Sequence, residues 1–200
     1  MGRLPRGFFA RDTLAVARDL LGTQLVRELD GERLSGIIVE CEAYIGQGDT
    51  ACHASRGRTP RNEVMFGPPG FAYVYFTYGM HWMLNVVTER EGFPAAVLLR
   101  ALQPMEGIEK MRAFREAKGR ARTDQELTSG PARLTQALGV DRTFNGADLV
   151  TGGQLWLERS DSILDDGVEC GPRIGVNYAA EKDRLAPWRY WVRDSPYVSH

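Results

Sequence analysis

GIIVECEAYIGQGDTACHASRGRTPRN, residues 36–62, is the stretch around which the rest of the chain is organised. Its first ten residues predict one β-strand, in which alternate side chains point to opposite faces. One face is predicted to be apolar and to pack on the core, with Ile37, Val39, Cys41, Ala43 and Ile45. The other face carries two carboxylates and an aromatic ring, with Ile38, Glu40, Glu42 and Tyr44.

The two acids and the polar loop that follows them are typical of an active site. Burying carboxylates without partners costs several kcal/mol, so a half-buried strand has no structural need for the pair. The strand is expected to end at Gly46 and Gly48, before a loop that carries Asp49, His53, Arg56, Arg58 and Arg61. The plainer alternative is a solvated strand edge followed by a histidine without a role. This stretch alone leaves the choice open.

Composition describes an ordinary globular chain and gives no sign of a special partner. The 200 residues are expected to form a single domain, residues 1–200. Three cysteines without metal-like spacing favour a reducing compartment over a disulfide framework. The sequence contains no run of about 20 apolar residues, so no membrane span is predicted. Because the formal net charge is only −1, any contact with nucleic acid must come from a local basic patch.

Two hairpins and a helix are predicted in the first half of the chain. A helix capped by Asp12 or Thr13 should run to about residue 21. Asp30-Gly31 predicts a tight turn between the strands 23–29 and 33–45. Residues 71–87 predict a second hairpin with its turn at Gly79, next to Tyr78. A large aromatic residue at such a tip could fold back on the domain, contact another protein, or wedge into a stack of bases.

The second half predicts an α+β domain on a curved antiparallel sheet, with surrounding helices and the protruding hairpin. Residues 95–102 are predicted to form a buried strand whose one charge, Arg100, needs an acidic partner or an anionic ligand, with Glu42, Glu40 or a phosphate as the candidates. Helices are predicted over about 105–115 and from Gly130 onward. The glycine at the start of the second helix leaves backbone N–H groups that could bind an anion. Lys118, Arg120 and Arg122 predict a basic loop. Three more strands are predicted at QLWLER, RIGVNY and RYWVR, which begin at residues 154, 173 and 189.

The order of these motifs resembles the alkyladenine (3-methyladenine) DNA glycosylase family. The resemblance rests on VECEAYIGQGDTACHASRGRTPRN, MFGPPGFAYVYFTYGMHWMLNV, LLRALQP, SGPARLTQALG, LWLER and RYWVRDSPYVS, and covers roughly residues 5–199. The family implies an enzyme that flips a damaged purine from duplex DNA and hydrolyses its N-glycosidic bond. It also implies binding in the minor groove, no metal and no cofactor.

The resemblance assigns the catalytic roles to residues of this chain. Glu42 matches the general base that activates water, and Glu40 is expected to be structural or electrostatic. Arg100 and the backbone carbonyl of Ile174 match the groups that hold this water. Tyr44 and His53 match the residues that hold the flipped base between them.

Further residues are assigned to base selection and DNA contact. Asn85 matches an asparagine that disfavours the 2-amino group of normal guanine, and Tyr78 matches the intercalating wedge. Contacts with the DNA backbone are expected from Arg56, Arg58, Arg61 and Met80. No lysine lies in this constellation, so no Schiff base with the sugar is expected, and the product should be an abasic site.

The substrates implied are 3-methyladenine and 7-methylguanine, with hypoxanthine and ethenoadenine as further candidates. The expected partner is double-stranded DNA, without a membrane, and the expected state is a monomer. The expected location is the cytoplasm, at the nucleoid of a bacterium or in the nucleus of a eukaryote.

Two functions of other classes compete with this interpretation. A metallohydrolase could use Glu40, Glu42, Asp49 and His53 as ligands, although no second histidine has ligand spacing. A noncatalytic nucleic-acid binder could use Tyr78 and the arginines, but it would not need Glu42 opposite an arginine.

Overall fold

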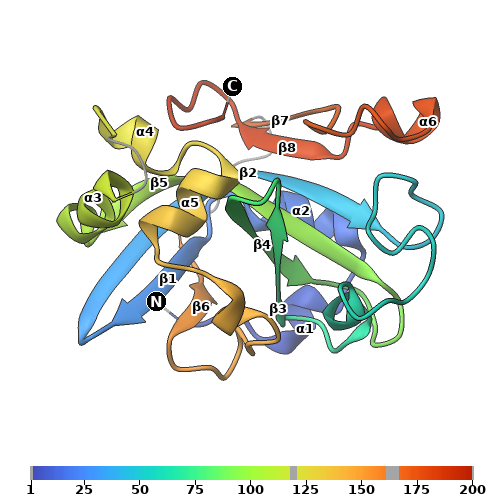
Figure 1. The fold of residues 1–200 in the computed structure, drawn as a ribbon, viewed down its shortest axis with the longest axis horizontal. Helices are drawn as coiled ribbons and strands as arrows, with labels where there is room; N and C mark the ends of the chain where they lie inside the picture. The colour runs from blue at the N-terminus through green and yellow to red at the C-terminus, as the bar shows by residue number, and fades with distance from the viewer. Residues whose placement is uncertain (1, 118–120, 161–166, 200) are drawn as a thin grey trace.

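A computed structural model describes residues 2–117, 121–160 and 167–199, and Figure 1 shows its ribbon. The described helices are α1 (Arg6–Phe9), α2 (Thr13–Leu20), α3 (Ile108–Glu116), α4 (Asp124–Thr128), α5 (Pro131–Ala137) and α6 (Glu181–Arg184), with 3-10 turns η1 (Glu63–Phe66) and η2 (Arg142–Phe144). The strands are β1 (Gln24–Leu29), β2 (Glu32–Ile45), β3 (Ala72–Thr77), β4 (His81–Val87), β5 (Ala95–Glu106), β6 (Leu155–Glu158), β7 (Val168–Gly171) and β8 (Arg189–Val192). Lys118 and Arg120 of the predicted basic loop lie outside the described residues.

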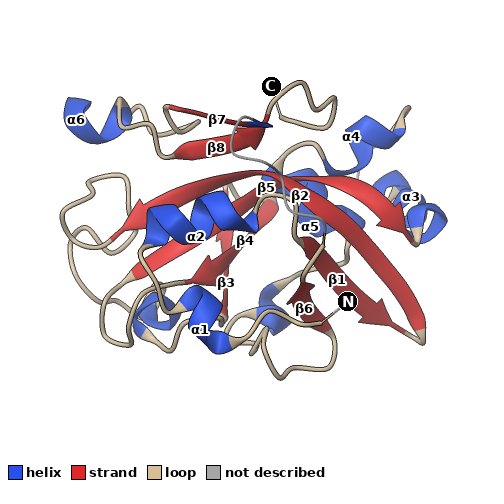
Figure 2. Cartoon of the chain, turned by 180° about the vertical axis from the view of Figure 1, so that it is seen from behind, coloured by secondary structure: helices blue, strands red, loops and turns tan. Residues whose placement is uncertain are grey.

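The described strands form one eight-stranded antiparallel sheet, which confirms the predicted α+β class. Six strands follow the order β3-β4-β5-β2-β1-β6, and β7 joins through β8, which pairs with β2. Figure 1 shows α5 in front of the curled sheet, and Figure 2 shows α2 in front of it from the opposite side. Helices therefore cover the sheet from both sides, and their apolar side chains join its core cluster.

Strand β2 has two neighbours in succession along one edge, and this arrangement buries its acids. β1 pairs with residues 32–37 and β8 with residues 40–42, while β5 follows the other edge. Because its second half lies between β5 and β8, the side chains of Glu40 and Glu42 are both 0% exposed. The alternative of a solvated strand edge is therefore wrong.

The predicted faces of β2 are confirmed at Cys41 but wrong at Ile37 and Ile38. Cys41 belongs to the core cluster, and so does Ile38, which was expected on the opposite face. Ile37 is only half-buried and lies outside that cluster. The pairing with β5 skips one residue on each strand, Val39 on β2 and Arg100 on β5. Because side chains alternate with a period of two, such a bulge moves the preceding side chains to the other face.

Both predicted hairpins and the predicted helix cap are confirmed. Asp30 and Gly31 have positive φ angles of 54° and 79°, as a tight turn between β1 and β2 requires. The side chain of Asp12 accepts a hydrogen bond from the Ala15 N–H at the start of α2. Strands β3 and β4 pair up to the tip, where Tyr78 is 79% exposed. This exposure excludes a tip tyrosine packed back on the domain.

Two predicted elements differ from the structure. The helix expected over 105–115 begins only at Ile108, because β5 continues to Glu106 and Gly107 turns the chain with a φ of 70°. The strand expected at residues 173–178 is a loop, since Arg173 is drawn into the interior and Gly175 has a φ of 78°. The strands expected around residues 155 and 189 are confirmed as β6 and β8. None of the helices described is long and apolar enough to cross a membrane.

Candidate active site

A cavity of about 810 Å³ opens beside β2, within the size range of small-molecule sites. Most of the residues predicted for a site share its wall: Tyr44, His53, Arg56, Tyr78, Asn85, Arg100 and Ile174. Glu42 lies directly behind the wall, where it binds three groups that line the cavity. Arg58, Arg61 and Met80 are exposed and lie outside the lining.

Glu42 is completely buried and is held at both carboxylate oxygens. Its Oε1 accepts a hydrogen bond from the Ile174 N–H at 2.7 Å and lies 3.2 Å from Nη1 of Arg100. Its Oε2 accepts from the Tyr44 hydroxyl at 2.8 Å. A carboxylate offers about four acceptor positions, so these three contacts leave one position on Oε2 for a further donor.

The Tyr44 phenol is a stable donor to this carboxylate. Burial and the nearby charge of Glu42 raise the pKa of Tyr44 well above its usual value. The hydroxyl therefore keeps its proton at neutral pH and donates to Glu42. The ring itself lines the cavity, so one residue both fixes the acid and forms the wall.

Arg100 contacts both acids of β2, which are two of the three candidate partners that the sequence left open. Its Nε lies 2.8 Å from Oε1 of Glu40, and Glu40 also binds Arg189 at 2.7 Å and both the N–H and the hydroxyl of Ser199. Burial raises the pKa of Glu40, but the Arg100 charge and the Ser199 hydrogen bonds outweigh it, so that the pKa is lowered. Glu40 is therefore ionised at neutral pH and held by two arginines and Ser199, whereas its structural or electrostatic role stays a prediction.

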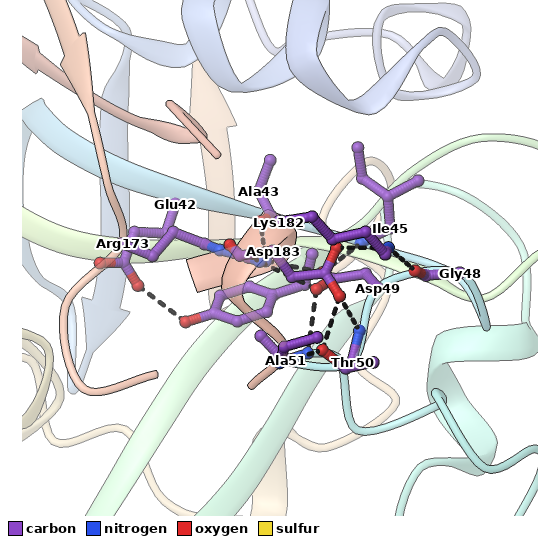
Figure 3. A network of polar contacts seen from close by, with 12 residues as sticks. Glu42, Ala43, Ile45, Gly48, Asp49, Thr50, Ala51, Arg173, Lys182 and Asp183 are labelled. Atoms are coloured by element: carbon purple, nitrogen blue, oxygen red, sulfur yellow. Dashed lines mark hydrogen bonds and ion pairs between the residues drawn. The ribbon is translucent and has the colours of Figure 1, made fainter. Parts of the chain in front are cut away.

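A second buried ion pair fixes the loop that presents the Ile174 N–H. Arg173 and Asp49 form a bidentate pair at 2.6 and 2.8 Å, and both side chains are 0% exposed (Figure 3). Arg173 also donates to the Ala43 carbonyl at 2.9 Å, next to Glu42 on β2. The guanidinium lies 4.7 Å from the ring of Tyr44. The pair therefore ties residues 173–174 to the strand that carries the acid.

His53 and two tyrosines of β3 form an aromatic side of the cavity. The ring of His53 lies 4.4 Å from Tyr75, and its Nδ1 is 2.9 Å from the Tyr73 hydroxyl. Burial, with a smaller effect from the charge of Arg61, lowers the pKa of His53 to about 4. The imidazole is therefore neutral at neutral pH. Burial raises the pKa of both tyrosines, so these walls carry aromatic rings without charge.

Asn85 is a buried residue of the cavity lining, opposite Tyr73 in the pairing of β3 and β4. Its amide donates to the Tyr73 carbonyl at 3.0 Å, which fixes its orientation. The exposed Arg58 pairs with Glu63 at 3.1 Å, and Arg61 lies over the ring of Tyr75 at 5.6 Å. Arg61 therefore lies against the aromatic side of the cavity.

Sequence reasoning missed Arg173, Arg189 and Ser199, which hold the acids from distant parts of the chain. Tyr75, which lines the cavity, was not assigned to the site either. One signal was available for Arg173, because it stands in a short apolar run just as Arg100 does.

The four side chains considered as metal ligands do not form a common site. The acids of β2 bind arginines, Asp49 binds Arg173, and His53 binds Tyr73. Within the described ranges, no three His, Cys, Asp or Glu side chains gather in a way that could hold a metal ion.

Comparison with known proteins identifies a family over nearly the whole chain. The model of the methylpurine-DNA glycosylase family matches residues 7–196. A relative from Methanocella arvoryzae is 53% identical over 196 residues, which cover 98% of this chain and 95% of the relative. A relative from Carboxydothermus hydrogenoformans is 51% identical over 98% of this chain and 98% of its own length. A relative from Chlorobaculum parvum is 47% identical over 100% of this chain and 91% of its own length. All three bear the name "Putative 3-methyladenine DNA glycosylase".

Proposed function

The chain belongs to the methylpurine-DNA glycosylase family, and on this premise we propose that it excises damaged purines from duplex DNA with Glu42 as general base. It is a DNA glycosylase, an enzyme of base excision repair, and DNA is its substrate. The proposed bases are 3-methyladenine and 7-methylguanine, with hypoxanthine or ethenoadenine as further substrates. The observation that carries the mechanism is a fully buried carboxylate with one free acceptor position behind an aromatic-lined cavity.

The proposed reaction needs modest activation of water by Glu42. Alkylation at N3 or N7 gives the purine a positive charge, which weakens the bond to the sugar. A water between Oε2 of Glu42 and C1′ gives a proton to the carboxylate as it attacks, and the base leaves with the bonding electrons. A general base of this kind contributes about 10²–10⁴ to the rate. Arg100 and the carbonyl of Ile174 are proposed to hold the water.

The chemistry of the aromatic walls favours a cationic purine. A positive ring is attracted to the electron-rich faces of tyrosines. His53 is neutral at neutral pH, so it can stack on such a base without repelling its charge. We propose that Tyr44 and His53 hold the flipped base between them, and that Asn85 disfavours the 2-amino group of normal guanine.

The surface around the cavity supports contacts with the minor groove. We propose that the exposed ring of Tyr78 fills the gap in the stack and that Arg56, Arg58, Arg61 and Met80 contact the DNA backbone. Each phosphate contact adds about 0.9 to the slope of log K against log salt. The proposed acting form is a monomer, in the compartment that holds the cell's DNA.

A panel of duplexes, each with one lesion, tests the function. The chain is mixed in excess with duplexes that carry 3-methyladenine, 7-methylguanine, hypoxanthine or ethenoadenine, and free base is measured. We expect the enzyme to release the base without alkali and to leave an abasic site. The DNA strand should be cleaved only when alkali is added, because none of the residues lining the cavity is a lysine that could form a Schiff base. Activity should persist with a chelator. Specific binding without base release from any duplex would instead support a noncatalytic binder.

Replacing Tyr78 with serine is expected to lower lesion binding and the extruded population of the base, with little change in melting temperature. The ring is 79% exposed, so the fold does not need it, whereas unstacking a base costs a few kcal/mol that the ring would offset. Fluorescence of 2-aminopurine or of an etheno base reports the extruded state. Tyr73→Ser is the control on the same hairpin, where truncating a buried ring costs about 3–5 kcal/mol. Normal flipping by an unstable Tyr78→Ser protein would refute the wedge.

A further inference from the structure

We propose that Ser199 is a positioning residue for Arg100, which it prevents from pairing fully with Glu42, so that the base keeps an acceptor for water. This inference rests on the proposed role of Glu42. Ser199 is 5% exposed and lies 157 residues from Glu42 in the sequence (199 − 42), so no local pattern points to it.

Arg100 is bound on three sides by three different groups. Its Nε donates to Glu40 at 2.8 Å, its Nη2 donates to the Ser199 hydroxyl at 3.1 Å, and only Nη1 faces Glu42, at 3.2 Å. The contact with Glu42 is the longest of the three. Glu40 and Ser199 therefore hold Nε and Nη2 of the guanidinium, and Nη1 is the nitrogen that contacts the proposed base.

Ser199 contributes to this arrangement with both of its polar groups. Its N–H donates to Oε2 of Glu40 at 2.7 Å, and its hydroxyl donates to Oε1 at 2.9 Å while it accepts from Arg100. A hydroxyl can donate once and accept twice, so these roles are compatible. Arg189 adds a second positive charge on Glu40 at 2.7 Å. The two negative charges of the acids and the two positive charges of the arginines therefore balance within one buried cluster.

The restraint on Arg100 matters for the rate because a released guanidinium could pair with Glu42 through two N–H groups. The guanidinium fork favours two parallel hydrogen bonds to one carboxylate. An Arg100 released from Ser199 can rotate and offer two N–H groups to Glu42. A bidentate pair would occupy the free acceptor position and stabilise the charge of the carboxylate, which makes it a weaker base. Ser199 opposes this rotation because its hydroxyl holds Nη2 of Arg100.

Ser199→Ala tests the proposal without removing the N–H that binds Glu40. We expect single-turnover release of 3-methyladenine to fall about tenfold, the size of one lost hydrogen bond to a charged group, with unchanged affinity for lesion DNA. Ser35→Ala is the matched control: this serine of β2 is also buried and also donates to a glutamate, Glu106, at 2.5 Å. It should lose comparable stability but keep the full rate.

Two further measurements separate positioning from general damage. In an Arg100→Lys background, Ser199→Ala should cause no additional loss of rate, because the group that it positions is gone. In the free protein, nitrogen-15 NMR should show the guanidinium of Arg100 rotating faster about its Cζ–Nε bond in Ser199→Ala than in the unchanged chain.

The outcomes decide the proposal separately from the function. A Ser199→Ala rate equal to that of Ser35→Ala, or an equal loss in both Arg100 backgrounds, would overturn the positioning role. If the wild-type protein releases no base, the proposed function is refuted. The NMR comparison would still report whether Ser199 restrains Arg100.

Discussion

Replacing Glu42 with glutamine is expected to lower the rate of base release by about 10²–10⁴ and to leave the affinity for lesion DNA nearly unchanged. An amide of the same shape can still accept from the Ile174 N–H through its oxygen and contact the Tyr44 hydroxyl through its nitrogen. It cannot take a proton from water. Single-turnover release from 3-methyladenine and hypoxanthine duplexes measures the rate, and a binding titration measures the affinity.

Glu40→Gln is the control, because Glu40 is equally buried on the same strand. It should reduce the rate less and the stability more, since it removes the charge that balances Arg100 and Arg189. Near-normal base release by Glu42→Gln, together with an inactive Glu40→Gln, would reverse the assignment of the two acids.

Replacing Asp49 with asparagine is expected to lower the free energy of unfolding by about 3–5 kcal/mol, the usual result of leaving one partner of a buried ion pair without its counter-charge. Arg173 and Asp49 are both completely buried, and their contact is bidentate. The same change should loosen the loop that presents the Ile174 N–H, so that this amide exchanges hydrogen faster. Urea denaturation and hydrogen exchange measure the two effects.

Asp19→Asn is the matched control for the loss of an ion pair. Asp19 binds Arg11 at 2.8 Å on the surface, where such a pair contributes at most about 1 kcal/mol. If Asp49→Asn destabilises the chain no more than Asp19→Asn, the pair with Arg173 does not hold the loop.

Features whose causes lie within a few residues could be predicted from the sequence. Asp30-Gly31 has the positive φ angles that its turn demands, and Asp12 caps the helix that follows it. Tyr78 stands at the tip of a hairpin because alternating apolar runs flank a glycine. Glu42 and Arg100 could be paired because a buried charge needs an opposite charge.

Features that depend on strand register could not be predicted in this way. Ile38 is in the core because the pairing of β2 and β5 skips Val39 and Arg100, and nothing in the local pattern marks a bulge. Arg173 was placed on a strand because its neighbours are apolar, whereas its partner Asp49 is 124 residues away. Partners at such separations are specified by the packing of the whole sheet.

The burial of Glu40 and Glu42 between β5 and β8 has a consequence for synthesis on the ribosome. A nascent chain of about a hundred residues contains both acids, but not the Ile174 N–H or Ser199, which reach Glu42 and Glu40 across 132 and 159 positions. Translation adds about 5–20 residues per second, so these partners are synthesised several seconds or more after the two acids. Among the strands that the structure describes, β8 emerges last and completes the pairing of β2. A partly translated chain therefore lacks the contacts that hold Glu40 and Glu42, and these contacts are complete only after both distant partners have emerged.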